Sequence, residues 1–345
     1  MKDLLKNLCN LDGVAGYEDD VRKYIMHQIS PYADTIETDA LGNLIAFKKG
    51  EKPRNRPVLI CAHMDEVGFL VTNITDEGQL HLTRVGGIDP RVLIGHRVRI
   101  GDNKIIGAVA LNGFGICSDE EIKYVPDIED LCVDIGNTSR FESEKIIDIG
   151  DPVYFDSDFI ELNDDCVRAK AFDDRIGCAI MIKMIENSLL YDTYFAFSTG
   201  EEVDCKGAEV IANRIKPGVS LVLETALATD FAEINVQRQS CRLRGGPVVS
   251  VLDGGTIYNK TLRNRILEAA DRQQIKWQLG KTGKGGTDSE IIHIAAGGSL
   301  AFGMGTPTRY IHCAYGILCL SDLMETLKMA TLFINEVGEC NDIII

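Results

Sequence analysis

A continuous apolar run in this chain ends abruptly in polar side chains that can do chemistry. Residues 58–62 are all apolar, Pro57 precedes them, and His63, Asp65 and Glu66 follow closely. Such a run predicts a strand buried on both faces of a sheet, and open α/β sheets present functional groups at the carboxyl ends of their strands. A His-x-Asp pair in this position is also common as a plain structural hydrogen bond, so its meaning depends on the rest of the chain.

Outside residues 67–160, strand-like and helix-like patterns alternate along the chain. This alternation predicts an α/β fold, with a mainly parallel sheet sandwiched by helices. The expected strands are 35–38, 44–47, 58–62, 194–198, 220–223, 248–252 and 299–302, and the expected helices are 18–29, 176–185, 207–214, 262–273, 288–296 and 323–334.

Residues 67–160 have a different pattern, in which short β-type runs are separated by glycine-containing turns. Only a short helix near residues 139–145 is expected among them. The chain of 345 residues also exceeds what one hydrophobic core usually serves. We therefore expect one domain from residues 1–66 and 161–345, interrupted by an inserted all-β domain at 67–160. The β-type runs are 68–74, 79–85, 91–100, 104–111 and 131–135.

Charge, apolar segments and cysteines exclude several classes of protein. The formal net charge of −16 argues against a nucleic-acid partner, because phosphate binding needs clustered lysine and arginine. No run approaches the ~20 apolar residues that span a bilayer, and the first residues lack the apolar segment of a signal peptide, so we expect a cytoplasmic protein with no membrane contact. The eleven cysteines form no C-x-x-C pair, and Cys61, Cys132 and Cys178 lie in apolar patterns. We expect reduced thiols that pack as small hydrophobic groups.

Further acids and an imidazole stand near the ends of the expected strands or the starts of helices. They are Asp173, Glu201, Glu202, Glu224 and His312. Each alone is as compatible with a helix cap or a solvated acid as with chemistry. Together with the first histidine they form the ligand set of zinc, cobalt or manganese, whereas calcium would call for oxygen ligands alone.

A charge argument favours two metal ions over one or none. Asp173, Glu202 and Glu224 would repel one another in a poorly solvated cleft. Two divalent cations supply +4 against −3, and a bridging hydroxide balances the remaining +1. Metal coordination lowers the pKa of water to about 7, so such a hydroxide is an available nucleophile at neutral pH. Adjacent side chains diverge, so one of Glu201 and Glu202 can bind metal while the other moves protons.

Five segments occur in a characteristic order along the chain: Ala-His-Met-Asp-Glu-Val-Gly at 62–68, Ala-Phe-Asp-Asp-Arg-Ile-Gly at 171–177, Glu-Glu-Val at 201–203, Gly-Gly-Thr-Asp at 285–288, and Arg-Tyr-Ile-His at 309–312. In this set the sequence resembles the M42 family of dinuclear metallo-aminopeptidases. The resemblance implies a zinc-peptidase-like catalytic domain with a β-rich dimerisation domain inserted into it. It also implies removal of single residues from the free amino termini of peptide substrates, by homo-oligomers in which dimers assemble into a dodecamer.

Carried over residue by residue, the resemblance assigns five metal ligands and two further catalytic residues. Zinc is the first candidate for the two divalent ions, with cobalt and manganese as alternatives. His63 and Glu224 would bind one ion, Glu202 and His312 the other and Asp173 both, while Glu201 would be the general base and Asp65 would orient the imidazole of His63.

Two positions depart from the family pattern. Glu224 stands where the family usually has aspartate, and Cys-Ala-Tyr-Gly at 313–316 stands where serine, proline and an acidic residue are frequent. Two alternatives to an aminopeptidase stay open. One is a metal-dependent deacylase or amidohydrolase acting on N-acylated substrates, and the other is an assembly protein of the same fold with a weakened site.

The stretch 280–286 is rich in glycine and lysine but lacks the G-x-x-x-x-G-K-[ST] order of a phosphate loop. We expect a mobile or substrate-facing loop there. Thr287 and Asp288 follow it, and we expect them to cap the next helix rather than to contact substrate.

Overall fold

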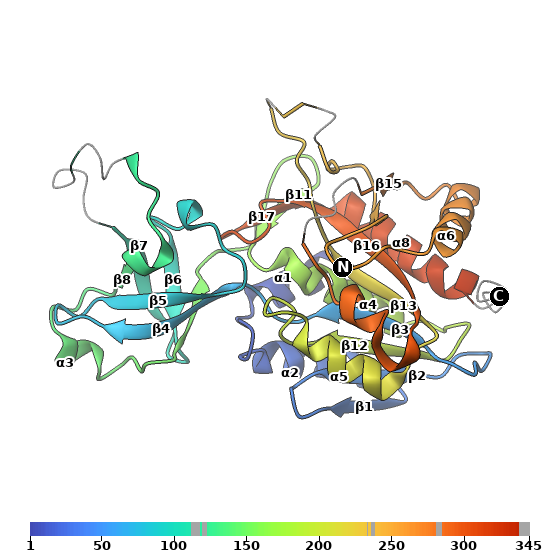
Figure 1. The fold of residues 1–345 in the computed structure, drawn as a ribbon, viewed down its shortest axis with the longest axis horizontal. Coiled ribbons are helices and arrows are strands. Elements are labelled where there is room, and N and C mark those ends of the chain that lie inside the picture. The colour runs from blue at the N-terminus through green and yellow to red at the C-terminus, as the bar shows by residue number, and fades with distance from the viewer. Residues whose placement is uncertain (112–117, 119–122, 233, 236–238, 281–284, 338–345) are drawn as a thin grey trace.

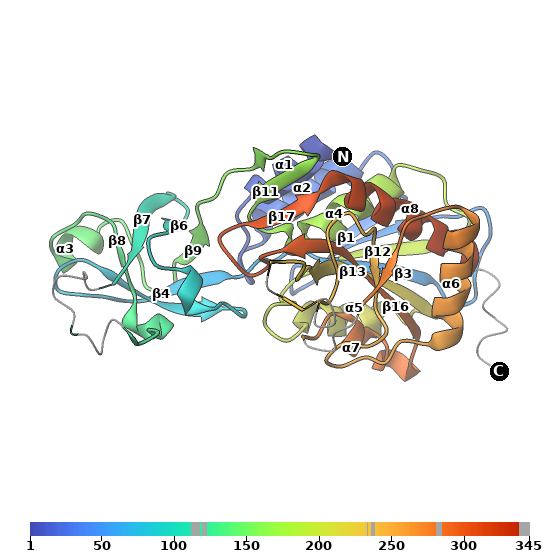
Figure 2. The same ribbon diagram turned by 90° about the horizontal axis from the view of Figure 1, so that it is seen from above.

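The computed structural model describes the chain except residues 112–117, 119–122, 233, 236–238, 281–284 and 338–345. An α/β domain and a small β-barrel lie side by side, so the molecule is elongated (Figures 1 and 2). The chain leaves the α/β domain after β3 (Val58–His63), forms the barrel, and returns at β10 (Ile160–Glu161), which precedes β11 (Cys166–Ala169). The predicted α/β fold with an inserted all-β unit is confirmed.

The large sheet is parallel at its centre and antiparallel at its edges. Its four central strands run the same way, so their carboxyl ends share one edge of the sheet. In order they are β12 (Thr193–Ser198), β3, β13 (Val219–Leu227) and β16 (Leu300–Arg309). The sheet extends beyond β12 through β2 (Leu44–Lys48) and β1 (Thr35–Thr38), and beyond β16 through β17 (Gly316–Cys319), β11 and β10. A short branch from β16 consists of β14 (Val248–Val249) and β15 (Gln278–Leu279).

Helices cover both faces of this sheet because its buried strands are apolar on both sides. In β3, Val58, Ile60 and Ala62 pack in the larger core, while Leu59 and Cys61 pack in a second core on the opposite face. The face with the larger core carries α1 (Lys2–Asn10), α2 (Asp19–Ile29), α4 (Phe172–Ile185), α6 (Lys260–Arg272) and α8 (Leu320–Glu336), and the opposite face carries α5 (Lys206–Ile215) and α7 (Ser289–Ile292).

No helix in the described part of the chain combines the length and the apolar character needed to cross a membrane.

The barrel is closed and has its own core, which includes Phe69, Val98, Val133 and Phe155. Closure leaves no free sheet edge within the barrel. Its strand order is β4 (Gly68–Ile74), β5 (Leu80–Val85), β8 (Cys132–Asp134), β7 (Ile105–Ala110), β6 (Arg97–Ile100) and β9 (Pro152–Phe155), with η1 (Pro90–Val92), η4 (Ile128–Asp130) and α3 (Arg140–Ser143) in its connections.

Some predicted elements are wrong in extent. The helix expected over 288–296 is only the single turn α7, followed by the 3₁₀ turn η6 (Ala295–Gly297). Ala296 has a φ of 52° and Gly298 a φ of 90°, and this left-handed backbone turns the chain into β16. The strand expected over 248–252 is reduced to the two residues of β14. Helix α1 had no counterpart among the predicted elements.

A buried charged network joins the two domains. Lys170 lies 2.5 Å from Glu66 and 3.3 Å from Asp12, measured from Nζ to the carboxylate oxygens, and donates to the carbonyl of Leu11 at 2.9 Å. Arg99, on barrel strand β6, donates to the same Asp12 oxygen at 2.6 Å. The side chains of Lys170 and Glu66 are 1% and 3% exposed. The network therefore fixes the barrel against the segments that enter β4 and leave β11.

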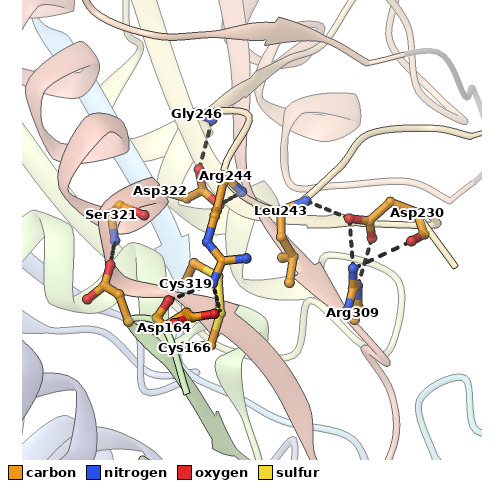
Figure 3. Close-up of a disulfide and its surroundings, with 11 residues drawn as sticks. Asp164, Cys166, Asp230, Leu243, Arg244, Gly246, Arg309, Cys319, Ser321 and Asp322 are labelled. Atoms are coloured by element: carbon orange, nitrogen blue, oxygen red, sulfur yellow. Dashed lines mark hydrogen bonds and ion pairs between the residues drawn. A yellow bond between two sulfur atoms is a disulfide. The ribbon is translucent and has the colours of Figure 1, made fainter. Parts of the chain in front are cut away.

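Two cysteines form a disulfide, which corrects the expectation that all thiols are reduced. Cys166 and Cys319 face each other in the antiparallel pair β11 and β17, with Cα atoms 4.1 Å apart. Figure 3 shows Arg244 reaching over this bond, where it donates to Cys166 Sγ at 3.5 Å and to the carbonyl of Asp164 at 2.6 Å. Strand pairing brings together two cysteines separated by 153 residues, which sequence spacing could not indicate. Cys61, Cys132 and Cys178 are free thiols.

Candidate metal centre

The candidate site lies at the edge of the sheet where the parallel strands end. Glu224 lies within β13, because that strand continues to Leu227 instead of ending at residue 223 as expected. Gly200, with a φ of 62°, makes the turn between β12 and the two adjacent glutamates. The remaining members take these places: His63 ends β3, Glu201 and Glu202 follow β12, Asp173 follows β11 at the start of α4, and His312 follows β16.

Asp173 lies between the two histidines. Its Oδ1 is 3.5 Å from Nε2 of His63 and its Oδ2 is 3.2 Å from Nε2 of His312. Glu224 Oε2 lies 3.7 Å from the first of these nitrogens, and Glu202 Oε1 lies 3.2 Å from the second. The five side chains therefore form two three-residue groups with the aspartate in common, and each group could hold a metal ion.

Backbone carbonyls fix the orientation of both imidazoles. Nδ1 of His63 is 3.0 Å from the carbonyl oxygen of Asp65, and Nδ1 of His312 is 2.7 Å from that of Gly87. Since a carbonyl can only accept, each Nδ1 carries a proton, and in the neutral ring the lone pair of Nε2 faces the carboxylates. This is the tautomer of a histidine that binds metal through Nε2. Gly87 follows β5, so the inserted barrel orients one of the two rings.

Asp65 links two parts of the site. Its fully buried carboxylate accepts the backbone N–H groups of Glu201 at 3.2 Å and Glu202 at 3.1 Å. The same carboxylate is 3.5 Å from Nδ1 of His63, whose closer partner is the Asp65 carbonyl. Asp65 therefore holds both the imidazole and the backbone that presents the two glutamates.

The cluster holds more negative charge than a buried site tolerates without cations. Burial raises the pKa of Glu224 and of Glu201 well above the usual value. Burial alone would lower the pKa of both histidines, but neighbouring carboxylates outweigh it and raise the pKa of His63 well above its usual value and that of His312 to about 11. The chain by itself thus retains protons within the cluster, and divalent ions would displace them.

The residues present fit a pair of divalent ions. Oxygen Oε1 of Glu224 is buried and has no hydrogen-bond partner among the described residues, although Oε2 of the same side chain faces His63. The longer side chain at this position therefore still reaches the cluster. Imidazole nitrogen and carboxylate oxygen together are suitable donors for zinc, cobalt or manganese. A third group, of His63, Glu201 and Glu202, has similar spacing.

A cavity of about 570 Å³ opens against the site. Asp173, Glu201, Glu202, Glu224 and His312 line it on one side. Residues of β14, of the loop after it and of the segment leading into α7 line it elsewhere. The cavity is therefore large enough to hold an amino-acid residue next to the metal-binding groups.

Asp288 was expected to cap a helix, and that expectation is wrong. Its carboxylate makes no cap hydrogen bond to α7; Oδ2 accepts the hydroxyl of Ser198 at 2.5 Å, and Oδ1 is buried without a partner among the described residues. Burial raises its pKa. Thr287 does accept the backbone N–H of Ser289 at 3.2 Å. In the sequence, Asp288 stood out only as the last residue of the Gly-Gly-Thr-Asp segment at 285–288. Of the loop preceding it, residues 281–284 lie outside the described residues.

With the geometry in place, comparison with known proteins identifies the family. The M42 glutamyl aminopeptidase family matches residues 42–329 of this chain. The chain belongs to the M42 peptidase family. The resemblance expected from the five sequence segments is confirmed, and the chain is a member of an enzyme family.

Relatives of this M42 peptidase match it over nearly its whole length. A putative aminopeptidase of Acetivibrio thermocellus is 35% identical over 333 residues, which are 95% of this chain and 97% of that protein. The TET aminopeptidase of Thaumarchaeota archaeon SCGC AB-539-E09 superposes with a TM-score of 0.94 at 31% identity, over 98% of this chain and 96% of that one. The TET1 peptidase of Pyrococcus horikoshii, which can assemble into a tetrahedron or a large octahedral shell, gives a TM-score of 0.85 at 32% identity, over 96% and 98% of the two chains.

Proposed function

We propose that this M42 peptidase removes the amino-terminal residue of peptides with the help of two divalent metal ions. His63 and Glu224 would hold one ion, Glu202 and His312 the other, and Asp173 would bridge them. The observation that carries this proposal is the position of the Asp173 carboxylate, each oxygen of which faces Nε2 of a different histidine. Zinc is the first candidate for both ions, and cobalt or manganese would suit the same donors.

The metal pair, when bound, would polarise the peptide carbonyl and activate water at neutral pH. Glu201 is the residue we propose for proton transfer. Its Oε2 lies 3.9 Å from Nε2 of His63, and its side chain lines the cavity, so it can reach both the attacking water and the leaving amine. Asp65 would support this role because it holds the backbone N–H of Glu201.

We further propose that residues 67–160 form a dimerisation domain, and that the remainder, 1–66 and 161–345, is the catalytic domain. Large apolar side chains stand exposed on the barrel, among them Ile106 at 52%, Phe141 at 69% and Ile149 at 62%. The tetrahedral and octahedral assemblies of the Pyrococcus relative support a homo-oligomer, and we propose dimers that combine into a dodecamer. Native mass spectrometry tests this, and a monomer at micromolar concentration would contradict it.

The peptidase proposal is tested with Glu201→Gln in protein loaded with zinc, cobalt or manganese. We expect the variant to lose at least about a hundredfold in the rate of release of amino-terminal residues from short peptides, because a general base is removed. Elemental analysis should still find two ions per chain. Glu209→Gln, on the exposed face of α5, is the matched control and should behave as the unmodified chain.

Other outcomes would replace the proposal with a specific alternative. Full activity in Glu201→Gln would show that another group transfers the proton, and loss of one ion would make Glu201 a ligand. Hydrolysis of N-acetylated but not free peptides would indicate a deacylase. Less than one ion per chain, not restored by added metal, would indicate an assembly protein with a weakened site.

A further inference from the structure

The cavity beside the metal-binding residues carries three acids that the proposed reaction does not use. They are Asp204, Asp253 and Glu290. Among the described residues that line the cavity there is no lysine or arginine. Once two divalent ions balance the ligand cluster, these acids remain as the source of charge on the other walls. The described walls of the cavity therefore favour a cation and disfavour an anion.

Two of the three acids already have partners. Asp253 accepts four hydrogen bonds, from the backbone N–H groups of Gly255 and Thr256 and from the hydroxyls of Tyr258 and Thr287, and so shapes its own loop. The Asp204 side chain is 89% exposed and lies 3.5 Å from Lys206. Solvent screens a charge in that position.

Glu290 differs from both of these acids. It is half-buried on α7, and within the described residues no lysine or arginine makes an ion pair with it. The thiol of Cys205 donates a weak hydrogen bond to its Oε1, with Sγ 3.9 Å away. Glu290 thus presents a carboxylate to the cavity without a cationic partner in the described chain.

Two glycines make room for this carboxylate. A Cβ atom at Gly255 would lie 2.3 Å from Oε2 of Glu290, and one at Gly286 would lie 2.6 Å from it. Neither glycine has a positive φ, so their backbone conformations are open to other residues. What requires glycine here is the space around the carboxylate, since a side chain at either position would displace it.

Glu290 lies within reach of a side chain held at the reacting centre. Sγ of Cys205 is 3.9 Å from Oε1 of Glu290 and 3.9 Å from Oε1 of Glu201, so the two carboxylates are at most twice that distance apart. A lysine side chain spans roughly 6 Å from Cα to Nζ, from five bonds of about 1.5 Å each. An amino-terminal residue whose Cα lies beside Glu201 could therefore bring its cation to Glu290.

We propose that Glu290 selects peptides with an amino-terminal lysine or arginine by forming an ion pair with that side chain. This inference rests on the proposed peptidase function and names its substrate class. Since no cation among the described residues competes for it, the Glu290 carboxylate gains a charge-assisted hydrogen bond from lysine or arginine, and it repels glutamate or aspartate. A neutral amino-terminal side chain is neither attracted nor repelled by this carboxylate.

The test compares kcat/KM for the p-nitroanilides of lysine, arginine, norleucine and glutamate. Norleucine matches the lysine stem but lacks the ammonium group. In the unmodified chain we expect lysine and arginine to exceed norleucine by about tenfold or more. Glu290→Gln should lose that advantage while keeping norleucine hydrolysis within about twofold, and Glu290→Lys should favour glutamate. Glu209→Gln is the control, and metal content and thermal midpoint verify folding.

A binding measurement separates this inference from the peptidase proposal. L-lysinol and L-norleucinol, which cannot be hydrolysed, are titrated calorimetrically into the metal-loaded chain. If no anilide is cleaved but lysinol binds about tenfold more tightly than norleucinol, and Glu290→Gln removes the difference, the peptidase proposal fails and the selectivity stands. Two results would overturn the role of Glu290. One is that the unmodified chain prefers the glutamate or norleucine anilide, and the other is that Glu290→Gln lowers kcat/KM equally for all substrates.

Discussion

Replacing Lys170 by methionine tests how the two domains are held together. Methionine keeps most of the buried length of the side chain but removes the ammonium group that lies 2.5 Å from Glu66 and 3.3 Å from Asp12. Removing one partner of a buried ion pair typically costs 3–5 kcal/mol, about the cost of leaving a charge uncompensated. Lys170→Met should therefore lower the free energy of unfolding substantially.

The remaining contacts of the two acids set the magnitude. Glu66 keeps the backbone N–H of Gly13 at 3.0 Å and the guanidinium of Arg175 at 3.6 Å, and Asp12 keeps Arg99 at 2.6 Å. Because both acids retain other donors, we expect a loss near the lower end of that range, about 3 kcal/mol. In a domain of 150–250 residues each 1 kcal/mol shifts the thermal midpoint by about 2–4 °C, and the shift is smaller in a longer chain, so we expect a decrease of roughly 5 °C.

The assay is denaturant and thermal unfolding of metal-loaded protein at pH 7, with the exposed Lys6→Met on α1 as the control. Adding Glu66→Gln to Lys170→Met should recover part of the loss, because it removes one stranded charge. Burial alone would raise the pKa of Asp12, but Lys170, Arg99 and Lys104 outweigh it and keep that pKa below its usual value. The stabilisation from Asp12 is therefore complete above its unfolded-state pKa of about 3.9 and is lost as the pH falls through the lower folded-state value.

The difference between Lys170→Met and the unmodified chain should thus shrink on acidification below about pH 4. The reasoning is refuted if the free energy of unfolding of Lys170→Met lies within 1 kcal/mol of that of the control, or if the double variant recovers none of the loss. Asp12 and Glu66 would then not depend on Lys170 for charge compensation.

Two further outcomes follow from the geometry. Removing metal with a chelator should lower the thermal midpoint measured by scanning fluorimetry. Adding zinc at about a hundred times its dissociation constant should restore about 2.7 kcal/mol of the free energy of unfolding. An unchanged midpoint would argue against metal binding by the folded chain. Gly207→Ala should destabilise by about 1–3 kcal/mol, because its Cβ would lie 2.2 Å from Oδ1 of Asn43 and 2.4 Å from the carbonyl oxygen of Thr199. Urea unfolding measures this, with Glu209→Ala on the exposed face of the same helix as the control. A Gly207→Ala variant as stable as that control would contradict the prediction.

The sequence alone determined the architecture and the type of chemistry. The apolar run of 58–62 predicted a strand buried on both faces, and the alternation of strand and helix patterns outside 67–160 predicted the helices that cover it. Parallel strands end at one edge of a sheet, so His63 and Glu202, far apart in the chain, could be expected at the same place. Patterns of this kind are local, and a local pattern can be read without coordinates.

Tertiary structure decided whatever depends on contacts between distant segments. The pairing of Cys166 with Cys319 follows from the register of β11 with β17, and the distances from Asp173 to the two histidines follow from the packing of three elements. Asp288 and Glu290 belong to one short turn, yet one points at Ser198 and the other lines the cavity. Residue types fix which groups are available, whereas charge compensation and the space around a carboxylate depend on which atoms the fold brings within a few ångströms of each other.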